Sequence, residues 1–417
     1  MKGKTISDGS KRRQIAYVGA WNTILLDLRN PYIITYWSMS FAGFGHILLD
    51  RYFRGFIFLT SEIFLNKAAN LNVAIYYTLT KQFDLAKQVL DIRWLMTYLA
   101  VYCFSIFDSY RDAVTINNTY ILAAREDAYV NCFAIDSGSF NSLNTVPPWM
   151  TMLWSAVLPG AGCILTPRMN RALFLIPLWI ITAYLSGLYP AVLYTFAGEF
   201  ELAKSVLDIH WLLNIPSFWF FAIYEAYSCA VENNKLCRWE LGKFLKTEYQ
   251  SKQFIMPDRA ERAPDTMYLL SSFEHSNKLE AAITELQMRG VPKTSILAVP
   301  LDKKNEGRAL FDSVHSSDGI SMLALPLILS MLGTFFGVIY GFQLAWGPIL
   351  WGVIGAIISF VVGLALRLLV AKKSTNDQNR RNKHDVILIV RCEKEQTDMV
   401  ENTLWSNAAI GVSQVDV

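Results

Sequence analysis

Long apolar segments constrain this chain more than any other feature. Each approaches the ~20 residues that a helix needs to cross the hydrocarbon of a bilayer. They run over 31–50, 54–79, 92–110, 146–166, 172–196, 209–230, 320–342 and 346–370. The composition agrees, because 53% hydrophobic and only 18% charged residues give more apolar surface than an ordinary soluble domain has. We therefore expect an all-α membrane bundle of about eight spans.

The first six segments form one three-segment unit that occurs twice. Trp37 aligns with Trp154, which is 117 positions later (154 minus 37). At the same offset, F-D-L-A-K-Q-V-L-D-I-R-W-L from Phe83 aligns with F-E-L-A-K-S-V-L-D-I-H-W-L from Phe200. A shared apolar composition would not place the polar residues of these stretches in register, so we interpret the pattern as a tandem duplication. Repeat 1 covers 31–118 and repeat 2 covers 146–234.

The orientation of the second copy depends on how many segments of each unit cross the membrane. If all three cross, the copies are inverted, as in many transporters. If one segment is re-entrant, the copies are parallel and their basic hairpins lie on the same side. The third segment of each unit is long and apolar enough to cross, which favours six full spans. Basic residues before the first segment and after the sixth predict that both regions are cytoplasmic.

Each unit carries two glycines followed by two arginines. These residues are Gly43, Gly45, Arg51 and Arg54 in repeat 1, and Gly160, Gly162, Arg168 and Arg171 in repeat 2. Glycines two residues apart allow backbones to approach closely, and the arginines are candidates for contacts with lipid phosphates at headgroup depth. The Pro159-Gly160-Ala161-Gly162 turn resembles small bacterial membrane modules in which two helices are joined around P-G-x-G. This resemblance implies a membrane-embedded hairpin and no particular reaction.

The region after repeat 2 reads as a soluble domain interrupted by a membrane hairpin. Strands are predicted at 267–273 and 295–301 around a helix at 276–289, and again at 385–391 and 410–415 around a helix at 395–407. This β-α-β-β-α-β order predicts a split ferredoxin-like α+β domain in the cytoplasm. The remaining parts are a basic N-terminal segment (1–30), linkers at 119–145, 235–265 and 302–319, the domain halves at 266–301 and 384–417, and the inserted hairpin at 320–371.

The C-terminal domain also carries a resemblance. Leu286-Gln287-Met288-Arg289-Gly290-Val291 before the second strand, followed by a Gly-rich apolar stretch, is similar to bacterial general-stress modules. The resemblance implies the ferredoxin-like fold alone. Because both resemblances are to bacterial modules, we expect the plasma membrane of a bacterium.

The inserted hairpin has small residues every four positions on each of its two helices. They are Gly333, Gly337 and Gly341 on the first helix, and Gly355, Ser359 and Gly363 on the second. Small residues at this spacing let helices meet at close backbone distance in a membrane. Two interpretations stand: packing of the hairpin on itself, which we favour, or an interface between copies of the chain.

A polar stripe in the second segment is the main candidate for an intramembrane site. Glu62, Asn66 and Asn70 recur at helical spacing with Lys67 beside them, and the second copy has no matching polar residues. Polar groups at this depth usually face a bundle interior or a watery cavity. The simpler interpretation is that Glu62 and Lys67 lie near an interface and neutralise one another.

Two carboxylates recur at the ends of the third and sixth segments. Asp108 and Glu225 are at equivalent positions, and we favour a structural role as partners of the arginine hairpins. His46, beside the first Gly-x-Gly, has Cys163 as its counterpart, and we favour simple packing for it.

The motif search favours no enzyme. The chain lacks Walker, dinucleotide-binding, H-E-x-x-H and G-x-S-x-G motifs, and its six cysteines lie far apart without metal-ligand spacing. We therefore expect no catalysis, metal, cofactor or nucleic-acid partner. Two hypotheses remain: a non-catalytic scaffold or regulatory protein that contacts membrane lipids and forms homo-oligomers or joins a membrane complex, or a transporter or channel with a pathway between the two repeats.

Overall fold

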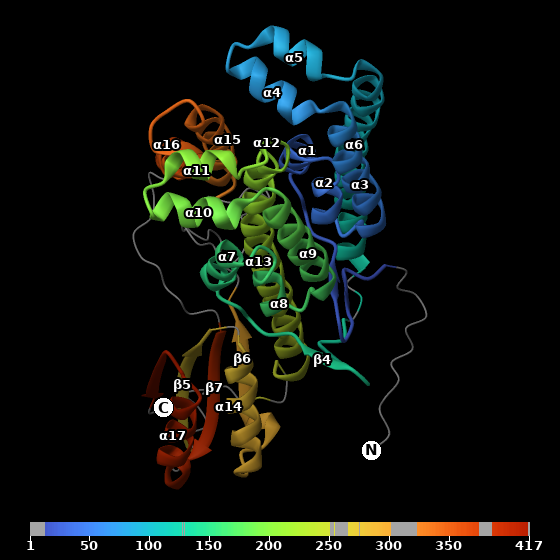
Figure 1. Ribbon diagram of the computed structural model, residues 1–417. Coiled ribbons are helices and arrows are strands. Elements are labelled where there is room, and N and C mark those ends of the chain that lie inside the picture. The colour runs from blue at the N-terminus through green and yellow to red at the C-terminus, as the bar shows by residue number, and fades with distance from the viewer. Residues whose placement is uncertain are drawn as a thin grey trace. The chain divides into compact units, whose positions relative to one another are not determined.

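The computed structural model (Figure 1) divides into two compact units. Unit 1 comprises Met1–Asn141, Val146–Glu232 and Arg308–Asn376, and unit 2 comprises Ser142–Thr145, Asn233–Gly307 and Asp377–Val417. The structure describes residues 13–126, 128, 130–250, 254, 266–274, 276–301, 323–374 and 386–415. The predicted linker at 302–319, the first residues of the basic N-terminal segment and most of the basic linker after 250 lie outside these ranges.

Unit 1 contains two runs of helices in the same order. The first run is α1 (Pro31–Ser40), α2 (Phe44–Leu48), α3 (Tyr52–Ala69), α4 (Leu71–Leu79), α5 (Phe83–Val89) and α6 (Ile92–Glu126). The second is α7 (Pro148–Val157), α8 (Gly162–Leu165), α9 (Met169–Leu185), α10 (Leu188–Phe196), α11 (Phe200–Ser205), α12 (Ile209–Leu212) and α13 (Ile215–Glu248), whose residues from Asn233 on belong to unit 2. The starts of α1 and α7, of α4 and α10, and of α5 and α11 are each 117 residues apart (148 minus 31, 188 minus 71, 200 minus 83).

The backbone bends at equivalent places in the two runs. Gly43 and Gly160 have φ of 100° and 97°, and Asn70 and Gly187 have φ of 52° and 69°. These are left-handed conformations that glycine and asparagine adopt most readily. The first pair separates α1 from α2 and α7 from α8, and the second separates α3 from α4 and α9 from α10.

The first segment of each run folds back on itself. A Cβ on Gly45 would lie 2.3 Å from Ser38 Oγ and 2.6 Å from the carbonyl of Ile34. Residues seven apart in a continuous helix would be about 10 Å apart along its axis, so the chain reverses between α1 and α2. The same contacts recur in the second run, where a Cβ on Gly162 would lie 2.7 Å from Ser155 Oγ. The segments 31–50 and 146–166 are therefore helical hairpins, not single helices of about 20 residues.

Two helices are long and apolar enough to cross a membrane. They are α15 (Ala324–Gly341) and α16 (Gly347–Ser374), the latter over Gly347–Leu369. The pairs α5 with α6 and α9 with α10 pass the same length and composition test together, but they are bent by 86° and 61°. The described residues thus hold two such helices, or up to four if each bent pair is one span. The prediction of about eight spans stays a prediction.

The glycines of the inserted hairpin pack its helices against each other. A Cβ on Gly333 would lie 2.0 Å from Ser359 Oγ, and one on Gly337 would lie 2.2 Å from the carbonyl of Trp351. A Cβ on Gly363 would likewise lie 2.7 Å from Pro326 Cα. Because the small faces of α15 and α16 are occupied by one another, the alternative of a glycine-lined interface between copies is wrong. Side chains such as Val361 and Leu369 remain exposed on α16.

A short β-hairpin precedes the first helical run. Strands β1 (Ala16–Val18) and β2 (Thr23–Leu25) pair antiparallel. The amide of Thr23 donates to the carbonyl of Pro167 at 2.7 Å, which attaches this hairpin to the loop before α9. A second pair of strands, β3 (Phe133–Asp136) and β4 (Ser139–Ser142), lies in the predicted linker between the repeats.

Unit 2 is built on a four-stranded antiparallel sheet. Its elements are β5 (Thr266–Phe273), α14 (Asn277–Met288), β6 (Ile296–Pro300), β7 (Val386–Glu393), α17 (Thr397–Ser406) and β8 (Gly411–Val415). These bounds agree with the predicted strands and helices to within about two residues. The strand order is β6-β7-β5-β8, and alternate residues of β7 such as Leu388 and Val390 are buried. Leu279 and Leu286 of α14 and Leu404 of α17 pack into the same core.

Candidate functional site

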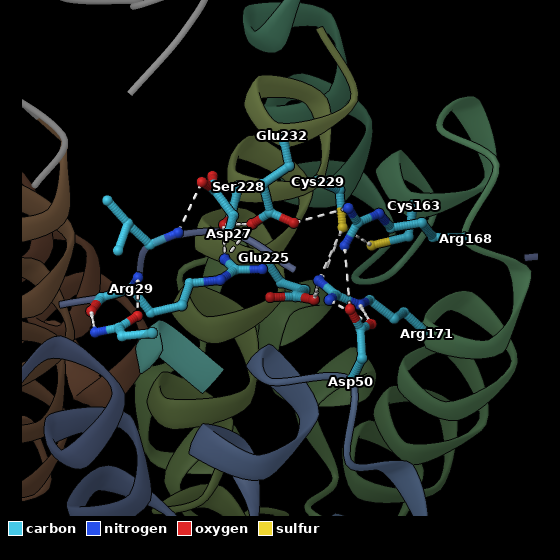
Figure 2. A network of polar contacts seen from close by, with 12 residues as sticks. Asp27, Arg29, Asp50, Cys163, Arg168, Arg171, Glu225, Ser228, Cys229 and Glu232 are labelled. Atoms are coloured by element: carbon cyan, nitrogen blue, oxygen red, sulfur yellow. Dashed lines mark hydrogen bonds and ion pairs between the residues drawn. The ribbon is translucent and has the colours of Figure 1, made fainter. Parts of the chain in front are cut away.

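The two arginine hairpins lie beside each other in unit 1. Asp50 lies two residues before the start of α3, and its Oδ1 accepts from Arg171 Nη2 at 2.7 Å and from Arg171 Nε at 3.2 Å. Its Oδ2 lies 3.9 Å from Arg168 Nη1. The carboxylate from the first hairpin is thus held by both arginines of the second, as Figure 2 shows.

The second hairpin belongs to a charged cluster whose side chains are buried or nearly so. Arg171 contacts Glu225, and Arg168 Nη2 lies 2.7 Å from Glu232 Oε2. Arg29 also contacts Glu232, which joins the segment before α1 to α13 (Figure 2). The exposed fractions of Arg168 and Arg171 are 1% and 0%. The prediction that these two arginines contact lipid phosphates is therefore wrong, because protein covers them and protein carboxylates neutralise them.

Charges nearly balance in this second cluster. Its three guanidiniums face four carboxylates, and all of these groups are buried or nearly so. They are Arg29, Arg168 and Arg171, with Asp27, Asp50, Glu225 and Glu232. A buried charge is tolerated only when it is paired and hydrogen-bonded, so each member depends on the others.

A first cluster occupies the equivalent position in the first helical run. Arg54 Nη1 lies 2.7 Å from Asp112 and 3.2 Å from Asp108, and Arg51 Nε lies 3.8 Å from Asp112. Arg111 also contacts Asp108. The three arginine side chains are 46–53% exposed, whereas those of the carboxylates are 4% and 9% exposed. Solvent therefore reaches the arginines of the first cluster, whereas protein covers those of the second cluster.

Asp108 and Glu225 contact the arginines of their own repeats, which is the pairing that we favoured from the sequence. Asp108 contacts Arg54, and Glu225 contacts Arg171. His46 is buried, and its Nε2 lies 3.2 Å from Asp108 Oδ2.

Two members of the Glu62 stripe, Glu62 and Asn66, are hydrogen-bonded to each other, and the other two lie apart from them. Glu62 Oε1 accepts from the hydroxyl of Tyr98 at 3.0 Å, and both residues are buried. Asn66 is also buried, and its Nδ2 donates to Asn72 Oδ1 at 3.2 Å. Lys67 is exposed on another side of α3, so it does not pair with Glu62. Asn70 ends α3, where its amide donates to the carbonyl of Val89 at 3.4 Å.

The Asn66 contact continues into the second helical run. Asn72 Nδ2 donates to Asn214 Oδ1 at 3.0 Å and to the carbonyl of His210 at 2.8 Å. Asn72 and Asn214 are not among the residues predicted from the sequence. The available signal was the presence of two asparagines within otherwise apolar segments.

Neither a metal centre nor a relative points to a reaction. Within the described ranges, no group of three or more His, Cys, Asp or Glu side chains could hold a metal ion. Comparisons with protein-family models, curated proteins and solved structures found no match.

Proposed function

We propose that this chain is a multi-pass plasma-membrane protein that acts as a non-catalytic scaffold. Its two repeats form a rigid bundle, and its N-terminus and C-terminal domain lie in the cytoplasm. The observation that carries this proposal is that polar contacts fasten the two repeats together at both ends of α3.

The contact at the first end is the charged one. Asp50 from repeat 1 is held by Arg168 and Arg171 from repeat 2, at 2.7 Å from Arg171 Nη2. All three groups are nearly inaccessible, with side-chain exposures of 6%, 1% and 0%. Breaking one partner away from such a buried pair costs about 3–5 kcal/mol.

The contact at the second end consists of neutral hydrogen bonds. Asn72 is the second residue of α4, the helix after α3, and bonds to Asn214 and to the backbone of His210 in repeat 2. Helix α3 has 18 residues, so the two contacts are about 27 Å apart along its axis. Alternating access commonly requires one repeat to rock against the other around a central site. Rocking in this protein would break one of the two contacts, which favours the scaffold.

A ferredoxin-like identity for unit 2 is part of the proposal. The sheet order β6-β7-β5-β8, with one helix after β5 and one after β7, is consistent with a split β-α-β-β-α-β unit. Strand β8 is at an edge of this sheet, and strand edges can pair with another chain. We propose that this domain is the assembly head of a homo-oligomer or of a membrane complex.

Distance measurements between the repeats test the scaffold. Phe64 and Ile181 are equivalent positions (181 minus 64 is 117), and both are exposed, at 60% and 55%. Cysteines at these two sites can carry spin labels once Cys103 and Cys132 are replaced by serine. In proteoliposomes we expect one distance distribution that does not change when a proton gradient or a membrane potential is applied. Two populations whose ratio changes with the gradient would contradict the scaffold.

One observation favours the alternative, a transporter or channel. Glu62 is a buried carboxyl group that is hydrogen-bonded to the hydroxyl of Tyr98 and to the side chain of Asn66, and buried carboxyl groups of this kind occur in proton pathways. The test is the flux of protons, Na⁺ and K⁺ through proteoliposomes. A flux that is lost in Glu62→Gln and kept in Lys67→Gln would establish the alternative.

A further inference from the structure

The two charged clusters occupy equivalent positions but differ in composition and in exposure. Each has two hairpin arginines at the start of a long helix and an acidic partner on the helix that ends the repeat. The second cluster also receives Asp50, a carboxylate from outside its own repeat. Among the described residues, no carboxylate from outside repeat 1 contacts the first cluster. Its arginines are about half exposed.

The second cluster shows which kind of group fits between the arginines. The Asp50 carboxylate lies in space next to the first residues of α9. One of its oxygens is 2.7 Å from Arg171 and the other is 3.9 Å from Arg168. Two guanidiniums around an oxyanion form the arrangement that recognises carboxylates and phosphates. Phosphate oxygens could occupy the same geometry at Arg51 and Arg54, which are the equivalents of Arg168 and Arg171.

The first cluster has an excess of positive charge, which favours the binding of an anion. Three guanidiniums, those of Arg51, Arg54 and Arg111, face two carboxylates. These side chains surround the start of α3, which has 18 residues and no side-chain cap at its N-terminus. The free amides and the dipole of a helix N-terminus also favour negative charge.

Aromatic side chains next to these arginines indicate the source of the anion. Phe107 is 60% exposed. The rings of Tyr32 and Tyr110, which are 74% and 40% exposed, lie 6.1 Å apart. Exposed aromatic rings beside arginines are typical of the interface between membrane and water. A phosphate bound here would belong to a lipid whose tails cover the aromatic rings.

We propose that Arg51, Arg54 and Arg111 bind the phosphate of an anionic lipid headgroup, in the way that Arg168 and Arg171 bind Asp50. The lipid site rests on the proposed function, because it needs the first cluster at the membrane surface. The sequence predicted lipid contacts for the arginines of both hairpins. The proposed site keeps only the hairpin of repeat 1 and adds Arg111 from α6.

Lipid selectivity of the full-length protein tests the site. The protein is placed in vesicles of phosphatidylcholine, and the association of spin-labelled phosphatidylglycerol is compared with that of spin-labelled phosphatidylcholine. We expect a preference for phosphatidylglycerol that falls about fivefold in Arg51→Gln and about fivefold in Arg111→Gln. Arg54 is left unchanged because it donates hydrogen bonds to both buried carboxylates, Asp108 and Asp112.

Arg93→Gln is the matched control. Arg93 is exposed near the other end of α6, 18 residues before Arg111 (111 minus 93) and therefore about 27 Å from it. Its substitution removes the same charge and is expected to leave the preference unchanged. An equal loss in all three variants would mean general attraction to positive charge and would overturn the site, as would an unchanged preference in Arg51→Gln and Arg111→Gln.

Inorganic phosphate distinguishes the two possible sources of the anion. If 10-fold excess free phosphate over lipid abolished the preference, the site would bind phosphate rather than lipid, and the proposal would be wrong.

The outcome of the lipid experiment is independent of the outcome of the scaffold test. A protein that showed two inter-repeat distances and still selected phosphatidylglycerol would lose the scaffold and keep the lipid site.

Discussion

Burial decides what each arginine of the hairpins does. Arg171 and Arg54 are equivalent residues, but their side-chain exposures are 0% and 46%. We expect Arg171→Gln to destabilise unit 1 by about 3–5 kcal/mol, because it leaves buried carboxylates without their partner. Arg54→Gln should lose about 1 kcal/mol, since solvent reaches that site and Arg111 stays beside Asp108. Unfolding by denaturant in mixed micelles measures both, and equal losses would contradict the distinction.

A carboxylate in unit 2 provides a pH-dependent contact. Asn407 Nδ2 donates to Glu285 Oε2 at 2.8 Å, and Arg289 lies 2.6 Å from Oε1. The hydrogen bond from Asn407, together with the charge of Arg289, lowers the pKa of Glu285 in the folded domain. A lowered pKa contributes stability above the unfolded pKa of about 4.3, and this stability is lost as the pH falls through the folded pKa.

Asn407→Ala should therefore destabilise unit 2 at pH 7, and less so as the pH falls below about 4. The measurement is the urea concentration at which the peptide covering α14 loses protection from hydrogen exchange, at each pH, in the whole protein. Asn277→Ala is the control, because Asn277 is on α14, the helix that carries Glu285, but lies eight residues before Glu285 (285 minus 277). A difference between Asn407→Ala and the unmodified protein that grew toward acid pH would refute the assignment.

The sequence predicted part of the charged site. Repetition drew attention to Asp108 and Glu225, because a carboxylate that occurs twice at one position is visible without a structure. Asp50 was missed because its counterpart in repeat 2 is Pro167, so the repeat itself hides it. Glu232 was also missed, and the signal that could have found it is its spacing of seven residues from Glu225, which places both on one side of α13. Burial of the hairpin arginines depends on tertiary packing and could not be read from the sequence.

At the scale of elements, hydropathy found the apolar segments but not their breaks. An average over 31–50 is insensitive to the reversal at Gly43, which arises from a left-handed φ and from the missing side chain of Gly45. The elements of unit 2 were predicted to within about two residues because alternating strands and a helix ended by Gly290 are local signals. The spacing of the glycines in α15 likewise predicted a close helix contact, and the structure resolved its alternatives in favour of α16.

The inserted hairpin allows a sharp test of that contact. A methyl group on Gly337 would meet the carbonyl of Trp351 at 2.2 Å, so the backbones of α15 and α16 would have to separate. On Gly352 it would meet Val338 Cγ2 at 2.9 Å, the end of a side chain that can rotate. We expect Gly337→Ala to destabilise the hairpin by about 1–3 kcal/mol and Gly352→Ala to have a smaller effect. Thermal unfolding in detergent measures both variants, and a larger effect of Gly352→Ala would contradict this packing.

At the scale of the whole molecule, the duplicated run of helices carries two different outcomes. In repeat 2 the charged cluster is closed by Asp50, while in repeat 1 it stays open, and only repeat 1 has the buried Glu62. A duplication begins with two identical copies, and contacts between the copies place equivalent residues in different surroundings. The contact at Asp50 uses repeat 1 to complete the cluster of repeat 2, which leaves the cluster of repeat 1 accessible for a ligand.

The same contact bears on how the repeats lie in the membrane. Asp50 and Arg171 belong to the two basic hairpins and are 2.7 Å apart, whereas inverted repeats would place these hairpins on opposite sides of a hydrocarbon core about 30 Å thick. With the first segment of each repeat folded back as α1–α2 and α7–α8, an even number of crossings remains in each copy. These observations support parallel repeats, in place of the inverted arrangement that six full spans would produce.

Thiol labelling decides between the two arrangements. Phe53 is 78% exposed and Asn170 is exposed, so cysteines at either position can react with a membrane-impermeant maleimide. For parallel repeats we expect both to be labelled from the same side of sealed vesicles. Leu85 and Leu202, equivalent positions on α5 and α11 that are 42% and 49% exposed, lie beyond the far ends of α3 and α9, and their cysteine variants should react from the other side. Labelling of positions 53 and 170 from opposite sides would restore the inverted repeat, and it would also require the Asp50–Arg171 contact to be absent from the protein in the membrane.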